Sequence, residues 1–160
     1  MKHALALLLL TASCGKIDAG KALTGTSKRT LQPRLQTVAQ AFGGAVLARD
    51  YDAAYEMMAS SYRQSLSKAE FLKSISRYRD HVHGELRLTV KASDDDPKEL
   101  KNDAIVQMLV PEHLRGAILD EAILNYDRSD ELGEGDGWVI VIWMINETGT
   151  IKILNYYQDD

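Results

Sequence analysis

The chain has 160 residues, which predicts one domain, because two would each be too small for a comfortable core. Hydrophobic residues make up 45% and charged residues 26%, a globular balance that excludes a disordered chain or a fibre. The formal net charge of −4 disfavours a non-specific nucleic-acid binder, since affinity for phosphate comes from Lys and Arg.

The first fourteen residues are typical of a secretory signal. Lys2 and His3 form a basic start, residues 4–10 are apolar, and small side chains lead to Cys14. The alternative is a buried amphipathic helix, but its leucines are consecutive and do not recur at helical spacing. Cys14 is the only cysteine, so the chain cannot form a disulfide within itself.

The segment Leu10-Thr11-Ala12-Ser13-Cys14 resembles the lipobox of bacterial lipoproteins, although an aliphatic residue is usual where Thr11 stands. The resemblance implies cleavage after residue 13 and a Cys14 that carries a diacylglycerol and an acyl chain such as palmitate. Two or more chains hold a protein stably on a bilayer, so we expect an anchor in the cell envelope. In Gram-negative lipoproteins, an Asp directly after the cysteine resembles a signal for retention in the inner membrane. This chain has Gly15 at that position, so the resemblance implies the outer membrane, facing the periplasm, if the cell is Gram-negative.

Residues 15–30 predict a flexible linker, because Gly, Ser and Thr recur there without a hydrophobic period. This linker carries a net charge of +3, which either draws it to anionic lipid or is simply solvated. Residues 31–160 form the expected globular domain. They hold 14 Lys and Arg against 22 Asp and Glu, a net charge of −8. Such acidity disfavours binding of nucleic acid or lipid headgroups by the domain itself.

Helices are predicted first in the domain. One apolar face at helical spacing predicts a helix with Pro33 in its first turn, and Gly43-Gly44 within it indicates close packing or a break. Asp50 is typical of an N-cap for a second helix that runs to about residue 60. Ser67 with Glu70 has the spacing of a capping box for a third helix. The first helix's apolar face comprises Leu35, Val38, Ala39, Phe42, Val46 and Leu47, and the third contains Phe71, Leu72, Ile75 and Tyr78.

From Glu85 onward, apolar and polar residues alternate or form short apolar runs, which predicts strands. Tight turns between them imply an antiparallel meander, and helices followed by strands imply an α+β fold in which helices pack on a curved sheet. Gly149 falls in a hairpin turn at a position that favours a positive φ. The expected strands are 86–90, 104–110, 121–126, 138–145 and 151–157; the expected turns are 94–97, 133–137 and 146–149, and 111–116 is a loop or one helical turn.

Three short segments, 48–55, 61–63 and 67–71, resemble the opening of the nuclear-transport-factor-2-like superfamily. The resemblance covers about residues 35–160 and implies a cone-shaped, cystatin-like α+β fold with a cavity between helices and sheet. Some members are isomerases, dehydratases or cyclases, and many others are binding or dimerising modules. The Asp and His residues that mark the isomerase members are not visible, so no catalytic residue is carried over.

Aromatic residues on the expected helices and strands are candidates to line that cavity, with core packing or an interface as the alternative for each. Trp138 and Trp143 are five residues apart, so a regular strand places them on opposite faces. The candidates are Tyr51, Tyr55, Tyr62, Tyr126, Trp138, Trp143 and Tyr156.

Two groups of polar residues have weak metal-binding patterns. His81 and His83 present two imidazoles on one face of an extended segment, but a zinc site needs further ligands. The acidic stretch after residue 126 lacks the spacing of an EF-hand. We interpret the first as a polar turn and the second as a solvated hairpin. Conceivable partners of the histidines are Asp80, Glu112 and His113, and the acidic stretch comprises Asp127, Asp130, Glu131, Glu134 and Asp136.

No G-x-S-x-G, Walker A or G-x-G-x-x-G motif occurs. We therefore expect a non-enzymatic lipoprotein without a cofactor, whose domain binds a protein partner, a second copy of itself or a small apolar ligand. The alternative is a small isomerase- or dehydratase-type enzyme that uses the cone as its active site, with a buried Asp or Tyr as acid or base. A structural helper in a larger envelope complex is indistinguishable from the first at this stage.

Overall fold

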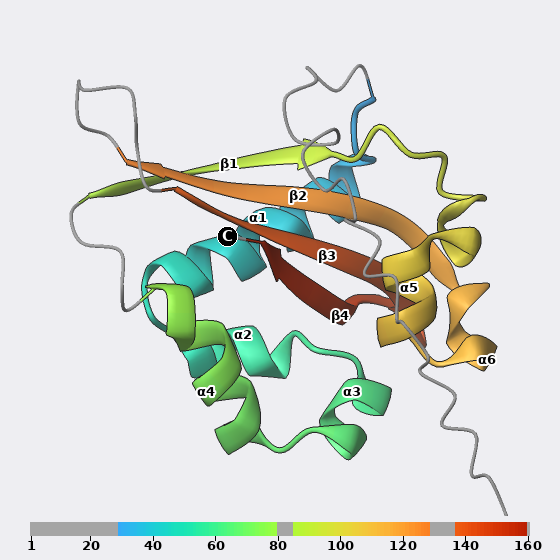
Figure 1. The fold of residues 1–160 in the computed structure, drawn as a ribbon, viewed down its shortest axis with the longest axis horizontal. Coiled ribbons are helices and arrows are strands. Elements are labelled where there is room, and N and C mark those ends of the chain that lie inside the picture. Colours follow the sequence, from blue (N-terminus) through green and yellow to red (C-terminus); the bar gives the residue numbers. More distant parts are fainter. Residues whose placement is uncertain (1–28, 80–84, 129–136, 160) are drawn as a thin grey trace, which may run out of the picture.

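The computed structural model describes residues 29–79, 85–128 and 137–159 (Figure 1). They form an α+β fold in which N-terminal helices pack against a four-stranded antiparallel sheet, which confirms the predicted class. The first part contains α1 (Pro33–Leu47), α2 (Tyr51–Glu56), α3 (Ser60–Ser65) and α4 (Lys68–Arg79). The second contains β1 (Leu86–Ala92), the 3-10 helix η2 (Leu100–Asn102), α5 (Ala104–Leu109), α6 (Glu112–Arg115), β2 (Ile118–Arg128), β3 (Trp138–Glu147) and β4 (Thr150–Asp159).

The strands follow one another in the order β1-β2-β3-β4, and each pair is antiparallel. This is the expected meander, and it leaves β1 and β4 at the two edges of the sheet. Opposite Trp143 and Met144, β4 has one extra residue, Leu154, because these two residues pair with Asn155 and Ile153. Such a bulge bends β4 locally and shifts by one residue which of its backbone groups face outward. Gly149 has φ of 89° in the turn between β3 and β4, as its position predicts.

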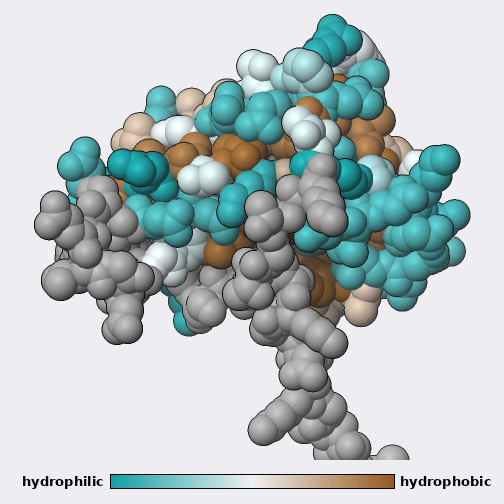
Figure 2. Space-filling view, turned by 90° about the horizontal axis from the view of Figure 1, so that it is seen from above, coloured by the Kyte–Doolittle hydropathy of each residue, from teal (hydrophilic) through white to brown (hydrophobic). Residues whose placement is uncertain are grey.

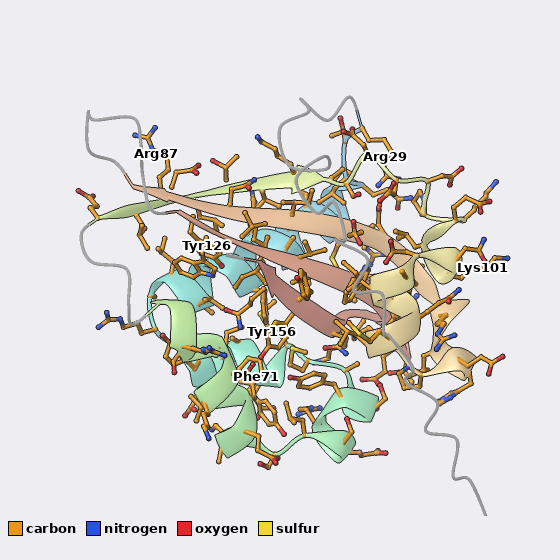
Figure 3. All side chains as sticks on the ribbon, in the orientation of Figure 1. Arg29, Phe71, Arg87, Lys101, Tyr126 and Tyr156 are labelled. Carbon is orange, nitrogen blue, oxygen red and sulfur yellow. The ribbon has the colours of Figure 1, made fainter. Side chains whose placement is uncertain are left out.

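Each face of the sheet carries its own hydrophobic core. The larger core lies between the sheet and α1, α2 and α4, and it includes Phe42, Phe71 and Tyr126. The smaller core lies on the other face, under η2, α5 and α6, and it includes Val106 and Trp143. Figure 3 shows Tyr126 between the sheet and α1, and Phe71 and Tyr156 turned toward one another below it. Seen from above in Figure 2, hydrophilic side chains surround a broken band of hydrophobic ones.

Local signals in the sequence explain where two helices begin. The N–H of Ala53 donates to Asp50 at 3.0 Å, which caps α2 as predicted. Before α4, Ser67 Oγ donates to Glu70 at 2.6 Å and the Glu70 N–H donates back to Ser67 Oγ at 3.3 Å, so the predicted capping box is confirmed. Helix α1 continues through Gly43-Gly44, where the sequence left open a break or close packing.

Residues 104–110, predicted as a strand, instead contain helix α5, so that prediction was wrong. Asp103 explains the difference, because its carboxylate accepts from the N–H groups of Ile105 and Val106 at 2.8 and 2.9 Å. Such an N-cap satisfies donors that a helix start leaves open. The following segment makes the single helical turn α6, which was one of its two predicted forms.

The predicted second helix, from Tyr51 to about residue 60, ends earlier, at Glu56, and a separate helix that was not predicted, α3, begins at Ser60. The chain leaves the helical path at Met58, which forms a parallel bridge with Ile153 of β4. Ile153 donates its N–H to the Met57 carbonyl at 3.0 Å and accepts from the Ala59 N–H at 2.7 Å. Pairing with a distant strand thus replaces two helical hydrogen bonds.

Arg29, which falls within the expected linker, contacts the domain. Its Nε donates to the Ser93 carbonyl at 3.0 Å, and its Nη2 pairs with the Asp120 carboxylate. Leu31 is already buried in the larger core. No helix in the described ranges has both the length and the apolar character needed to cross a membrane.

Candidate functional site

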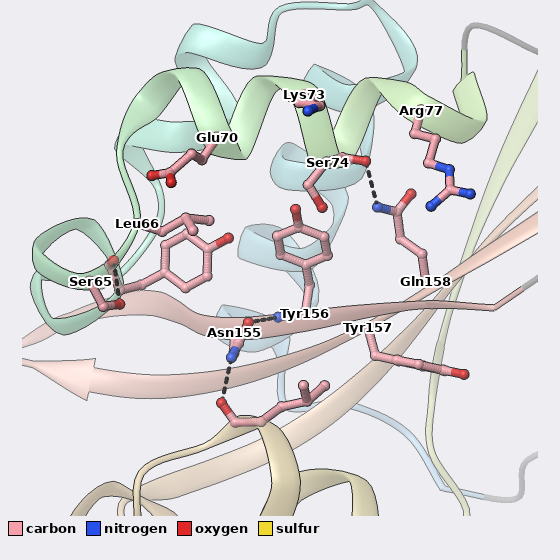
Figure 4. Close-up of a pocket in the computed structure, with 12 residues that line it drawn as sticks. Ser65, Leu66, Glu70, Lys73, Ser74, Arg77, Asn155, Tyr156, Tyr157 and Gln158 are labelled. Carbon is pink, nitrogen blue, oxygen red and sulfur yellow. Dashed lines mark hydrogen bonds between the residues drawn. The ribbon is translucent and has the colours of Figure 1, made fainter.

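An open groove of about 690 Å³ runs beside the edge strand β4 (Figure 4). Helix α4 forms one wall, β4 forms the floor, and residues at the end of α3 and at the end of α5 border the groove. This volume falls within the range of ligand sites in proteins. The lining from α4 is Glu70, Lys73, Ser74 and Arg77; that from β4 is Asn155, Tyr156, Tyr157 and Gln158; Tyr62, Ser65, Leu66 and Leu109 complete it.

The outer edge of β4 borders this groove. Tyr156 donates its backbone N–H to Oδ1 of the Asn155 side chain at 2.8 Å. An N–H on the inner edge of β4 would bond to β3, so this side-chain bond indicates that the group points to the outer edge. Groups two residues apart in a strand share an orientation, which places the backbone of Gln158 outward as well. In the described part of the chain, the outer edge of β4 pairs with other backbone at Ile153, which bonds to Met57 and Ala59. From Asn155 to Gln158, β4 borders the groove where a neighbouring strand would otherwise lie.

Side-chain amides occupy part of that edge. Nδ2 of Asn155 donates to the Leu109 carbonyl at 2.7 Å, and Nε2 of Gln158 donates to the Ser74 carbonyl at 3.1 Å. Oε1 of Gln158 is buried and accepts no hydrogen bond from the described residues. The two amides therefore tie β4 to α5 and α4, and one acceptor beside the groove stays open.

The floor of the groove rests on an aromatic cluster. Phe71 packs against Tyr62 and Tyr156 with ring centroids 6.2 and 5.7 Å away in edge-to-face geometry, and the two tyrosine rings are 6.1 Å apart. Such aromatic contacts add to the energy of burial. Burial raises the pKa of the Tyr62 and Tyr156 phenols, and the proximity of Tyr156 raises that of Tyr62 further. Both phenols are therefore neutral at physiological pH, which suits them to hydrogen bonding and not to acting as bases.

Charged side chains on α4 lie along the opposite wall. Lys73 and Arg77 are exposed and four residues apart, so they occupy one face of the helix. Glu70 stands one turn before Lys73, and hydrogen bonds from Ser67 lower the pKa of its carboxyl. The wall thus has one anionic end and a longer cationic stretch.

Two of the seven aromatic candidates, Tyr62 and Tyr156, line the groove. The other candidates serve elsewhere. Tyr55 packs against Phe71 with the two rings tilted by 51°, and it donates its hydroxyl to the Leu66 carbonyl at 2.9 Å. Tyr51 packs half-buried against the larger core.

The remaining three aromatic candidates are buried in the cores. Tyr126 and Trp138 stack at 4.0 Å with an interplanar angle of 5°, and the Tyr126 hydroxyl donates to the Gly43 carbonyl at 3.1 Å. Trp143 lies in the core on the other face, so the prediction that Trp138 and Trp143 occupy opposite faces is confirmed.

The other candidate residues are not brought together. His81, His83, Asp80 and Cys14 lie outside the described residues, as do Asp130, Glu131, Glu134 and Asp136. Glu112 and His113 are exposed on α6, and Asp127 is exposed at the end of β2. Within the ranges that the structure describes, no three His, Cys, Asp or Glu side chains are placed to hold a metal ion.

A buried polar cluster on β2 was missed by the sequence reasoning. Glu121 accepts from Nε1 of Trp143 at 2.5 Å, and burial raises the pKa of its carboxyl. The neighbouring Asp120 accepts from the Glu121 N–H at 2.8 Å and pairs with Arg29. Two consecutive acids at the start of an otherwise apolar strand were the available signal, but alternation alone places only one of them on each face.

The sequence reasoning also missed the residues that give the groove its polarity, Lys73, Ser74, Arg77, Asn155 and Gln158. Their types are common on solvated surfaces, and only the position of β4 at the sheet edge brings them together. No family model, curated protein or solved structure matches this chain, so the geometry of the groove carries the functional argument.

Proposed function

We propose that this chain is a lipid-anchored protein of the bacterial cell envelope whose α+β domain binds an extended segment of a partner protein in the groove beside β4. The observation that carries the proposal is the outer edge of β4 beyond Ile153, which adjoins no further strand among the described residues and faces a groove of about 690 Å³. An extended peptide that adds a strand to such an edge obtains its affinity from main-chain hydrogen bonds.

The side chain of Asn155 marks where a peptide group of the partner would lie. Its carboxamide accepts from the Tyr156 N–H on β4 and donates to the Leu109 carbonyl on α5. A carboxamide has the same donor and acceptor as a peptide unit. A bound strand would replace this amide and continue the line of residues 57–59, which already pair with β4 at Ile153.

The chemistry of the groove supports binding over catalysis. Its two buried phenols have raised pKa values and stay protonated, and the described residues that line it include no His, Cys or Asp. Open sides and mixed polar and aromatic walls suit a segment that must enter and leave. The helix-before-sheet order also supports the resemblance to the nuclear-transport-factor-2-like superfamily, and the lipobox around Cys14 supports the anchor.

The test uses a display library of ten-residue peptides, panned against the full lipid-modified chain in detergent micelles. Ser74→Tyr introduces a large side chain on the α4 wall, where Ser74 is exposed. Ser76→Tyr is the matched control, because Ser76 lies on the same helix and does not line the groove. We expect the wild type and Ser76→Tyr to select and bind the same peptides, and Ser74→Tyr to lose them.

Amide hydrogen exchange then locates the bound peptide. Strand addition protects the N–H groups of Tyr156 and Gln158, because these face the outer edge of β4. The proposal is overturned if no peptide is selected, or if selected peptides bind Ser74→Tyr as tightly as the wild type.

A further inference from the structure

We infer that the segment recognised in this groove is acidic, with carboxylates at alternate positions that face Lys73 and Arg77. The inference rests on the proposed function and names the class of partner. Its basis is the match between the spacing of cations on α4 and the spacing of side chains in an extended peptide that lies along β4.

The two repeat distances agree. Residues four apart on a helix are separated by about 6 Å along its axis, at 1.5 Å per residue. Side chains on one face of an extended strand recur every two residues, or about 6.6–6.8 Å. Figure 4 shows α4 running along β4, with Ser74 above Tyr156 and Arg77 beyond Gln158. A strand placed between them therefore presents successive same-face side chains to Lys73 and Arg77.

The charge of this wall contrasts with that of the domain. Residues 31–160 carry a net charge of −8, which repels an acidic segment from most of the surface. Lys73 and Arg77 form a local cationic stretch directly over the groove. An acidic segment is thus favoured at this position and disfavoured at others, and electrostatic complementarity of this kind gives specificity more than affinity.

Glu70 makes one end of the α4 wall anionic, so the two ends of the groove differ in charge. Its carboxylate lies one turn from Lys73, on the side away from Arg77, and hydrogen bonds from Ser67 hold it ionised. A carboxylate on the peptide opposite Glu70 would be repelled. The groove therefore favours a segment whose acids lie beside Lys73 and Arg77 and whose position beside Glu70 is neutral or basic.

The experiment measures the affinity of fluorescent eight-residue peptides for the full lipid-modified chain in detergent micelles. One peptide alternates Asp with Thr, a second alternates Lys with Thr, and a third alternates Asn with Thr. The variants are Lys73→Glu/Arg77→Glu and the control Lys101→Glu. Lys101 is an exposed lysine of η2 that does not line the groove, and Figure 3 shows it at the opposite end of the molecule from α4.

We expect the wild type and Lys101→Glu to prefer the Asp peptide. The double charge reversal should weaken its binding about tenfold, as two exposed ion pairs turned into repulsions imply. It should also strengthen binding of the Lys peptide, which a variant that merely unfolds cannot do. The preference should shrink as salt rises, because these charges are exposed.

Equal binding of the Asp and Asn peptides by the wild type would overturn the acidic preference and leave strand addition in the groove intact. The same holds if the Asp peptide binds the double variant as well as it binds the wild type. If none of the three peptides binds any form of the chain, this inference is overturned, and the library selection decides the proposed function separately.

Discussion

Gly43 and Gly44 are adjacent in the middle of α1, and we expect their replacement by Ala to have different effects on stability. A Cβ at Gly43 would lie 2.8 and 3.1 Å from the two methyl carbons of Leu88 on β1, and 3.4 Å from the Tyr126 hydroxyl. A Cβ at Gly44 would meet no atom within 4 Å. Comparing Gly43→Ala with Gly44→Ala therefore distinguishes two effects on stability: the higher helix propensity of Ala, which both variants share, and the crowding of α1 against the sheet, which only Gly43→Ala causes.

The magnitudes follow from these distances. In a helix interior, Gly is less favourable than Ala by about 0.8–1.0 kcal/mol, so Gly44→Ala should raise the free energy of unfolding by about that amount. Gly43→Ala has the same gain but forces Leu88 to move, and overpacking of this kind costs about 1–3 kcal/mol. Gly43→Ala should therefore be about 1–3 kcal/mol less stable than Gly44→Ala.

Urea unfolding, followed by the fluorescence of the two buried tryptophans, measures both variants. A double-mutant cycle with Leu88→Ala identifies the cause, since removing the Leu88 methyl groups should relieve most of the cost of Gly43→Ala. The reasoning is refuted if the two glycine variants shift the free energy of unfolding equally, or if Leu88→Ala leaves the difference between them unchanged.

Two further predictions concern Glu121 and Cys14. Burial raises the pKa of the Glu121 carboxyl above its ordinary value of 4.5, so its contribution to stability is most favourable below about pH 4.5 and declines as the pH rises through the folded pKa. Glu121→Gln keeps an oxygen for Trp143 and should stabilise the protein more at pH 7 than at pH 4; equal effects in urea titrations at both pH values would contradict the assignment. Cys14→Ser should leave the signal uncleaved and the protein without lipid; a variant of mature mass that still partitions into the detergent phase would disprove the anchor.

Much of the fold was predictable because its signals are local. The capping box of Ser67 and Glu70, the cap at Asp50 and the turn at Gly149 each involve residues within a few positions of one another, and all three predictions are confirmed. Alternating residues predicted the strand at 86–90 and an apolar run predicted the one at 138–145, because burial of one or both faces leaves its mark on the sequence itself. The strands predicted at 121–126 and 151–157 also lie within β2 and β4. The α+β class followed from the order of these elements.

Local pattern failed where two signals competed. Residues 104–110 include enough apolar and β-branched residues to predict a strand. The N-cap supplied by Asp103 and the burial of Val106 in the smaller core favour a helix instead. Residues 57–59 continue a helical pattern, yet their hydrogen bonds go to Ile153 of β4, about a hundred residues later in the chain. Neither outcome can be seen within a short window of sequence.

The candidate site shows the same division. The sequence by itself identified Tyr62 and Tyr156 as aromatic candidates, and it determined the acidity of the domain and the position of its only cysteine. Tertiary structure alone decided that these two tyrosines share a groove, and that Lys73 and Arg77 of α4 line it together with residues of β4. The physical reason is that an open strand edge is a property of the assembled sheet. In the described chain no further strand of the sheet lies beyond β4, and only the packing of α4 and α5 turns its outer edge into a groove.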